Sequence, residues 1–434
     1  MIDKNNILQG YKNSVVGIIP EEWDVKTFSE LGSTLSTNTL SRDMMNEESG
    51  YALNIHYGDV LVKYGEILNC SKINIPWINY EYAENNLGAQ LKDGDVVISD
   101  TAEDYSVGKV TELQGISNAK VFSGLHTIAY RPNKNIFSQR FLGYYFNSSI
   151  YRKQLYPLIQ GIKVCSISKS AISKTKLAIP PLAEQKKIAE ILCTWDDAIE
   201  KQSKLIEKLE NRKRGLMQCL LTGKTRLHGF TEPWKKIKLG EIGSTYTGLS
   251  GKTKSDFENG NAKFISYVNV FSNEKVNIND FGTVKVNSNE KQNIVRYGDI
   301  FFTVSSETPN EVGMSSVLLD AVENTYLNSF CFGYRLNDFS VLEPVFASYI
   351  LRTDKFRSSI ILLAQGSTRF NLSKNEVMKL QIKLPLLAEQ KAIAAVLTSA
   401  DKEIETQRKK LEVLRQQKRG LMQQLLTGKI RVTI

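Results

Sequence analysis

The sequence lacks the features of a secreted, disulfide-linked or membrane-spanning protein. Its five cysteines are scattered, odd in number and never spaced as C-x-x-C, which argues against a disulfide framework and a zinc site. No window approaches about 18 uninterrupted apolar residues, and the opening segment MIDKNNILQGYKNS has no apolar core of signal-peptide length. We therefore expect a cytoplasmic protein whose cysteines stay reduced.

Catalytic motifs are also missing. The three histidines stand apart from one another and from any serine or cysteine elbow, which predicts structural or surface roles. The run GKT at 251–253 resembles the end of a phosphate-binding loop, but Tyr246 occupies the place of the required first glycine. The acidic residues Asp100 and Glu103 are compatible with an acidic nuclease centre, although no suitably spaced lysine accompanies them. The sequence predicts a non-catalytic chain with no metal or cofactor of its own.

The composition is that of a basic, globular protein. The 434 residues are 41% hydrophobic and 24% charged, which suits two domains of roughly 150 to 200 residues each. Lysine and arginine number 56 against 46 acids, giving a formal net charge of +10. This balance is compatible with a polyanionic partner such as nucleic acid, and equally with an ordinary basic protein.

An internal repeat is the strongest signal in the sequence. Residues 182–227 align with 387–432 without a gap, and 27 of the 46 positions are identical. A fainter repeat relates 17–34 to 229–245, and QGIKVCSISKS at 160–170 matches QGSTRFNLSKN at 365–375. The segment ILQGYKNSVVGIIPEEW also resembles the later LLTGKTRLHGFTEPW. The sequence therefore predicts a tandem, nearly cyclic duplication with dissimilar middles.

Each copy of the strong repeat follows a heptad pattern of roughly 38 residues, or about 57 Å as a helix. Proline precedes each segment and glycine follows it, as expected for helix starts and stops. The positions expected to pair the helices are Ile188, Leu192, Ile199, Gln202 and Leu209 in the first copy, and Ile393, Leu397, Ile404, Gln407 and Leu414 in the second.

These helices are expected to pair with each other, antiparallel, because a tandem repeat can then imitate a two-fold dimer. Two polar residues interrupt each seam, Gln202 and Lys213 in the first and their equivalents in the second. The glutamines either fix the register or face solvent at the seam edge. Gly215 and Gly420 within the helices indicate either a close backbone approach or a local break.

The expected fold class is mixed α/β, with two similar globular domains separated by the helix pair. The expected boundaries are 1–182 for the first domain with a short N-terminal leader, 183–222 for the first helix, 223–387 for the linker and second domain, 388–427 for the second helix and 428–434 for a tail.

The modules carry polar and basic loop segments suited to base edges and phosphates. Arginine and lysine bond guanine, asparagine bonds adenine, and lysine neutralises phosphate. Such loops are common on protein surfaces, so each assignment is a hypothesis. The candidate DNA-binding residues are Lys163, Ser166, Lys169, Lys252, Lys254, Ser367, Arg369, Asn371 and Lys374.

Several of the repeated motifs match a known family. They are PEEW with SELGS and EPW with GEIGS at the module starts, IPPLAEQKKIAEIL and LPLLAEQKAIAAVL entering the helices, and KRGLMQCLLTGK and KRGLMQQLLTGK leaving them. On these residues the chain resembles, over nearly its whole length, the specificity subunit of type I restriction-modification enzymes.

The resemblance implies that each module is a target recognition domain reading one half of a bipartite, asymmetric DNA site. It implies that the helices set the unread gap and dock two modification subunits, which bring S-adenosylmethionine and methylate an adenine. Restriction subunits would join through that core, with ATP and Mg. Two alternatives remain at this stage: a coiled-coil adaptor, and the recognition portion of a single-chain restriction-methylation enzyme.

Overall fold

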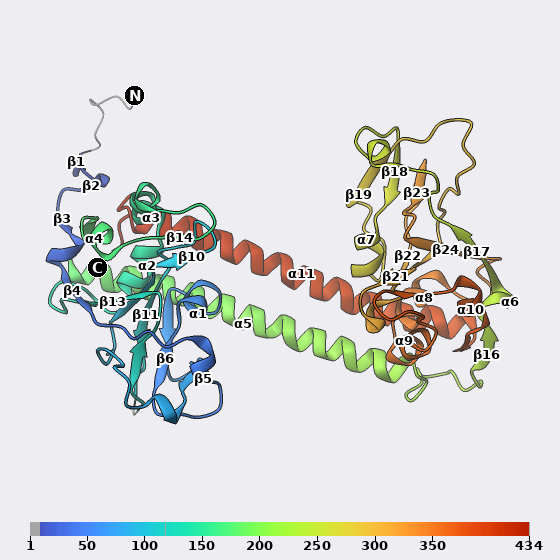
Figure 1. Cartoon of the computed structure of the whole chain (residues 1–434), viewed down its shortest axis with the longest axis horizontal. Helices are drawn as coiled ribbons and strands as arrows, with labels where there is room; N and C mark the ends of the chain where they lie inside the picture. Colours follow the sequence, from blue (N-terminus) through green and yellow to red (C-terminus); the bar gives the residue numbers. More distant parts are fainter. Residues whose placement is uncertain (1–8, 118, 434) are drawn as a thin grey trace. The chain divides into compact units, whose positions relative to one another are not determined.

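A computed structural model describes residues 9–117 and 119–433, so the first eight residues of the expected leader lie outside the described part. The chain divides into two compact units: unit 1 combines Met1–Ser203 with Lys409–Ile434, and unit 2 is Lys204–Arg408. Each unit contains one module and one end of each of two long helices (Figure 1). The domain boundaries expected from the sequence remain predictions.

The module of unit 1 is built from short strands and a few short helices. Its strands are β1 (Tyr11–Ser14), β2 (Gly17–Pro20), β3 (Asp24–Thr27), β4 (Gly32–Leu35), β5 (Met45–Asn46), β6 (Leu53–Ile55), β7 (Ile67–Asn69), β8 (Trp77–Ile78), β9 (Val96–Ser99), β10 (Thr101–Ala102), β11 (Val110–Gln114), β12 (Val121–Ser123), β13 (Thr127–Pro132), β14 (Cys165–Ser166) and β15 (Lys176–Ile179). Its helices are α1 (Tyr57–Val62), α2 (Phe141–Asn147), α3 (Ser149–Leu155) and α4 (Lys169–Ile172).

The main sheet of unit 1 has five strands in the order β4-β13-β9-β11-β7, antiparallel except for the parallel pair β11 and β7. A second sheet has the order β12-β6-β8-β5. Buried aromatic rings fill the core, and the Tyr130 hydroxyl donates to the carbonyl oxygen of Phe28 at 3.0 Å. This mixed topology confirms the expected fold class.

The module of unit 2 has a similar set of elements. Its strands are β16 (Lys235–Lys238), β17 (Gly243–Thr247), β18 (Ala262–Ile265), β19 (Phe281–Val284), β20 (Ile300–Thr303), β21 (Ser305–Ser306), β22 (Ser315–Val317), β23 (Thr325–Leu327), β24 (Cys331–Leu336), β25 (Phe370–Asn371) and β26 (Gln381–Leu384). Its helices are α6 (Leu239–Ile242), α7 (Tyr267–Ser272), α8 (Pro344–Ile350), α9 (Asp354–Ile361) and α10 (Lys374–Lys379).

The two modules share one plan. The order β17-β24-β20-β22 in unit 2 reproduces β4-β13-β9-β11 of unit 1. In each module a half-exposed arginine forms an ion pair with a buried aspartate. Arg131 on β13 pairs with Asp95, and Arg335 on β24 pairs with Asp299, each at 2.6 Å. The duplication expected from the chain ends therefore extends through the dissimilar middles.

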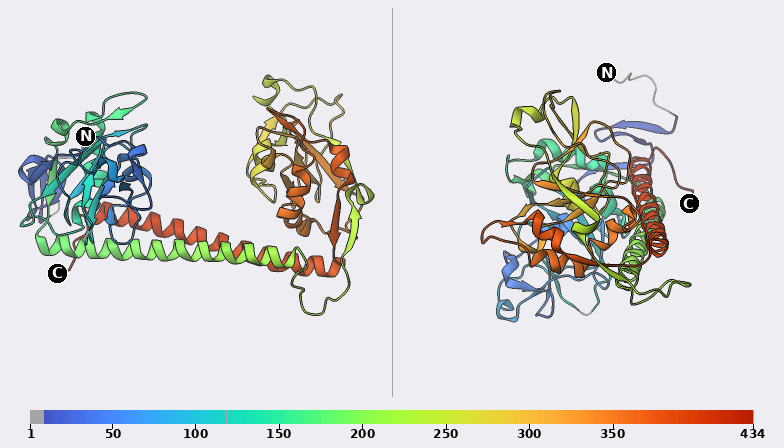
Figure 2. Two further views of the ribbon diagram at one scale, coloured as in Figure 1. Left: turned by 60° about the horizontal axis from the view of Figure 1, so that its bottom comes forward. Right: turned by 90° about the vertical axis from the view of Figure 1, so that its right-hand side faces the viewer.

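The two long helices are α5 (Leu182–Leu220) and α11 (Leu387–Leu425), each of 39 residues. In unit 1 the beginning of α5 shares a core with the end of α11, since Ile188 and Leu192 cluster with Leu425. In unit 2 the end of α5 shares a core with the beginning of α11, through Leu220 and Ile393. The helix segments therefore run antiparallel within each unit, as expected (Figure 2).

The ten residues expected to pair the helices are all buried or half-buried in the structure. Their pairing role remains a prediction. Gln202 is 6% exposed and Gln407 is half-buried, so neither faces open solvent. The buried members are Ile188, Leu192, Gln202, Ile393, Leu397 and Ile404, and the half-buried members are Ile199, Leu209, Gln407 and Leu414.

The helix glycines differ from both expectations. α5 and α11 continue without a break through Gly215 and Gly420, and a Cβ atom built at either position would meet open space. Neither a close backbone approach nor a helix break explains these residues, and nothing in the structure does.

The chain ends are arranged in the nearly cyclic manner expected. In unit 1 the Tyr11 hydroxyl donates to the carbonyl oxygen of Gly428 at 2.8 Å, and Gly428 packs closely on Pro20 and Trp23. In unit 2 the linker glycine Gly223 packs in the same way on Trp234. The C-terminal segment thus occupies in unit 1 the place that the linker occupies in unit 2.

Among the helices of the described residues, none combines the length and the apolar character that a membrane crossing requires.

Candidate nucleic-acid interface

Each module presents one exposed loop of the same construction. Loop A is residues 160–166 and loop B is residues 365–371. Gln160 and Ser166 exchange two backbone hydrogen bonds at 2.9 and 2.8 Å, and Gln365 and Asn371 exchange two at 3.0 and 2.8 Å. The two loops are therefore closed in the same way, although their sequences differ.

A glycine makes this closure possible. Gly161 and Gly366 have φ angles of +99° and +129°, a region that side chains rarely adopt. A Cβ atom on Gly161 would lie 2.0 Å from the carbonyl oxygen of Val164, and one on Gly366 would lie 2.1 Å from that of Arg369. The shared Q-G dipeptide thus determines the shape, while the next residues are free to vary.

Short strands hold the loops against the modules. β14 pairs with β10 in unit 1, and β25 pairs with β21 in unit 2. Loop A exposes Ile162 and Val164, with Lys163 between them, whereas loop B exposes Ser367 and Arg369. One construction therefore carries two different sets of side chains, an apolar and basic set and a polar and basic set.

Aromatic residues that the sequence analysis missed stand beside the loops. In unit 2, Tyr267, Phe330 and Arg369 line a common surface pocket, and the Tyr267 hydroxyl donates to the carbonyl oxygen of Ser305 at 2.8 Å. In unit 1, Tyr57 and His126 make an edge-on ring contact at 5.4 Å. No motif marks these residues, because they come from separate segments.

Paired arginines support the neighbouring hairpins. Arg152 donates to the carbonyl oxygens of Val107 and Tyr105 at 2.7 and 2.6 Å. Its equivalent Arg357 donates to three carbonyl oxygens between residues 310 and 313. These side chains satisfy backbone oxygens, so they position loop segments and have few N–H groups left for a ligand.

Most of the predicted DNA-binding residues are exposed to solvent. Lys252 differs, because its side chain is only 5% exposed and its ammonium lies 2.5 Å from Glu290. That hydrogen bond, with others from Gln292 and Asn287, lowers the pKa of Glu290 to about 2. The exposed candidates are Lys163, Ser166, Lys169, Lys254, Ser367, Arg369 and Asn371, and Lys374 is half-buried at the first position of α10. All remain predictions.

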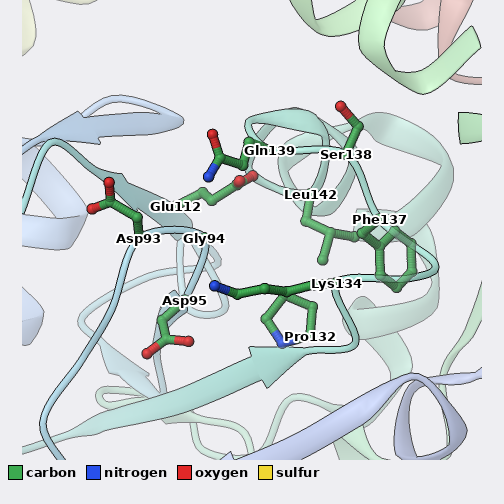
Figure 3. A pocket seen from close by; sticks show the side chains of 10 residues that line it. All are labelled: Asp93, Gly94, Asp95, Glu112, Pro132, Lys134, Phe137, Ser138, Gln139 and Leu142. Atoms are coloured by element: carbon green, nitrogen blue, oxygen red, sulfur yellow. The ribbon is translucent and has the colours of Figure 1, made fainter. Parts of the chain in front are cut away.

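A carboxylate is buried elsewhere in unit 1, in the pocket of Figure 3. Glu112 on β11 is 2% exposed, and its two oxygens accept the backbone N–H groups of Arg140 and Gly143 at the start of α2. Burial raises the pKa of Glu112 to about 7, although these N–H groups oppose the increase. Val317 occupies the matching strand position in unit 2, so the shared fold does not need the acid.

The raised pKa of Glu112 predicts that the free energy of unfolding depends on pH. The folded-state pKa lies above the ordinary glutamate value of 4.5, so the unfolded chain loses this proton first and stability falls as pH rises toward about 7. A difference of about 2.5 pKa units corresponds to roughly 3 kcal/mol. Chemical denaturation should show that the stability of the natural chain, relative to Glu112→Gln, falls by this order between pH 5 and 8. A pH-independent difference would contradict the prediction.

No group of three or more histidine, cysteine, aspartate or glutamate side chains placed to hold a metal ion occurs in the described ranges. All five cysteines are free thiols.

Comparison with known proteins identifies the family. The model described as the type I restriction modification DNA specificity domain matches residues 20–211 and 231–416, one match for each half of the repeat. The chain belongs to this family. As a type I specificity subunit it is a DNA-recognition subunit of a restriction-modification system and is not itself an enzyme.

Individual relatives agree with this assignment. The putative type I restriction enzyme MjaX specificity subunit of Methanocaldococcus jannaschii is 26% identical over 98% of this chain and 97% of its own length. The type I specificity subunit structure from M. genitalium has a TM-score of 0.51 at 14% identity, covering 93% of this chain and 96% of its own. A chain from a structural study of type I R-M complex assembly has a TM-score of 0.61 at 18% identity, covering 95% and 99%. These two structures have the same fold.

Proposed function

We propose that each module of this specificity subunit reads one half of a bipartite, asymmetric DNA site. The observation that carries the proposal is the duplicated loop: loops A and B have the same glycine-dependent closure but expose different side chains. Base edges in the major groove differ in their donors and acceptors, so different side chains on one scaffold read different sequences. The aromatic rings beside the loops add apolar contact surface.

We further propose that α5 and α11 set the unread gap and dock two modification subunits, which supply S-adenosylmethionine and methylate an adenine. Restriction subunits would supply ATP-dependent, Mg-dependent chemistry. The complex would act in the cytoplasm, where free thiols stay reduced. The family assignment favours this function over a coiled-coil adaptor or a portion of a single-chain enzyme, since the matched family is a DNA specificity domain.

Salt dependence tests the DNA contact directly. Each phosphate neutralised by lysine or arginine contributes a slope of about −0.9 to a plot of log K against log salt. The full-length chain should bind duplex DNA weakly, with a slope that corresponds to several phosphates, in fluorescence anisotropy. Specific binding should become tight only when modification subunits are added. A chain whose weak binding did not change with salt would contradict the proposal.

Loop B offers a sharper test. Gly366→Ala forces a Cβ atom against the carbonyl oxygen of Arg369, so the loop must change shape. We expect at least about a 10-fold loss of affinity for the cognate site, equal to about 1.4 kcal/mol, with non-specific binding unchanged. Gly420→Ala is the matched control, because its Cβ would meet open space. Equal cognate affinity for both variants would exclude loop B from recognition.

A further inference from the structure

A pocket in unit 2 lies outside the loops and has no role in the proposed function. Its floor is apolar and includes Trp234, Phe356 and Ile382, of which the last two are buried. Lys236, Lys355 and Lys383 lie around it, each exposed to solvent. We refer to it as the lysine pocket, and no acidic side chain lines it.

The arrangement of these lysines is unfavourable for the chain alone. Lys236 on β16 and Lys383 on β26 are direct cross-strand partners, and like charges placed opposite each other destabilise a strand pair. None of the three lysines lies within 4.0 Å of a carboxylate oxygen among the described residues. The pocket therefore gathers positive charge that nothing in unit 2 balances by direct contact.

The floor also contains a hydrogen-bond donor without an acceptor. The indole nitrogen of Trp234 is buried and has no partner in the part of the chain that the structure describes. Its equivalent, Trp23, donates to Glu184 at 3.0 Å in unit 1. In unit 2 the matching Glu389 accepts hydrogen bonds from Arg226 at 2.6 and 2.7 Å, as Glu184 does from Arg431 in unit 1, but it accepts none from Trp234. Burying an N–H group without an acceptor is costly, so a ligand that brought an acceptor to this nitrogen would remove that cost.

Unit 1 shows the same place without the charges. Val25 and Ala178 are cross-strand partners there, at the positions of Lys236 and Lys383, and Ile150 stands at the position of Lys355. These residues join a core that also contains Ile19 of the hairpin β1-β2, which unit 2 lacks. In unit 1 the chain thus places apolar residues at the positions that the lysines occupy in unit 2.

We propose that the lysine pocket binds an acidic peptide segment of a partner protein, with an apolar side chain on the floor and carboxylates against the lysines. The apolar floor favours a peptide over a phosphodiester, which has no apolar group to bury there. Position supports the same choice, because β16 lies on the side of unit 2 away from α7 and β21, where loop B is anchored (Figures 1 and 2).

The test uses the full-length chain and an array of synthetic 12-residue peptides in which aspartate or glutamate flanks leucine or phenylalanine. Acidic peptides should bind, and their Asn/Gln counterparts should not. Lys236→Glu with Lys383→Glu should weaken binding at least 10-fold. The matched control, Lys224→Glu with Lys235→Glu, reverses two exposed lysines that do not line the pocket and should leave binding unchanged.

A spectroscopic signal locates the contact. The chain has four tryptophans, so incorporated 5-fluorotryptophan gives a small set of fluorine resonances, and Trp234→Phe assigns the one of interest. Bound peptide should shift the Trp234 resonance and leave the other three in place. The proposal is overturned if no acidic peptide binds, if binding survives the Lys236/Lys383 reversal, or if inorganic phosphate produces the same shift. It is also overturned if that reversal weakens only DNA binding, an outcome that would leave the proposed function intact.

Discussion

Replacing Lys418 with methionine is expected to lower the free energy of unfolding by roughly 3 kcal/mol. Lys418 lies on α11 with its side chain 8% exposed, and its ammonium is 2.5 Å from Asp196 and 2.9 Å from Glu66. Asp196 also accepts the hydroxyl of Tyr144 at 2.5 Å. Methionine would leave two neighbouring, partly buried carboxylates without their cation.

The pKa values show that the cluster depends on its charges. Burial alone would lower the pKa of Lys418, but Glu66 and Asp196 outweigh it and raise that pKa. Burial raises the pKa of Asp196, in spite of the contact with Lys418. The lysine therefore stays charged, and removing it makes ionisation of both acids less favourable.

Unit 2 contains the equivalent cluster with the helices exchanged. Lys213 of α5 contacts Asp401 of α11 at 2.7 Å and Glu274 of the module at 3.3 Å, and Tyr349 donates to Asp401 at 2.5 Å. In each unit, one lysine thus joins the other long helix and the module at a single point. Lys213→Met should destabilise less than Lys418→Met, because Lys275 also contacts Asp401 at 3.0 Å and Lys213 is more exposed than Lys418.

Arg419→Met is the control for the lysine prediction. Arg419 pairs with Glu412 at 3.0 Å on the same helix, but the two side chains are 64% and 62% exposed, so the loss should stay below about 1 kcal/mol. Urea denaturation of the three variants measures the difference. Equal losses for Lys418→Met and Arg419→Met would show that the cluster contributes no more than a surface ion pair.

Lengthening both long helices by one heptad is expected to widen the tolerated DNA gap by about three base pairs. Seven residues add about 10.5 Å to a helix, and B-DNA rises about 3.4 Å per base pair. The insertions belong between Ser203 and Lys204 and between Arg408 and Lys409, where the chain passes from one compact unit to the other. Each unit then keeps its own helix contacts and its lysine cluster.

Sequencing of methylated genomic sites in a host that carries the modification subunits measures this result. Both half-sites should keep their bases, because loops A and B are unchanged. An insertion in α5 alone is the control, since it alters one helix without its partner and should reduce methylation at every site. Altered half-site bases with an unchanged gap would contradict the division of labour between helices and modules.

The sequence by itself determined the features that repeat locally. The 46-residue repeat, the heptads and the flanking proline and glycine predicted two helices of about 38 residues, close to the observed 39. Apolar residues recur every three or four positions on the buried face of a helix, so this pattern can be recognised in the sequence alone. The same reading predicted mixed α/β modules, a non-catalytic chain and, through the resemblance, the family.

Only the tertiary structure decided which distant residues meet. Lys418 appeared in the sequence as a polar interruption of the seam, whereas its partner Glu66 lies 352 positions away. The contact of Lys252 with Glu290 also appears only in the folded chain, and the role of Lys252 in DNA binding stays a prediction. Lys236 and Lys383 become cross-strand partners only when β16 and β26 pair. Such contacts depend on chain reversals and sheet pairing over long separations, and no local periodicity records them.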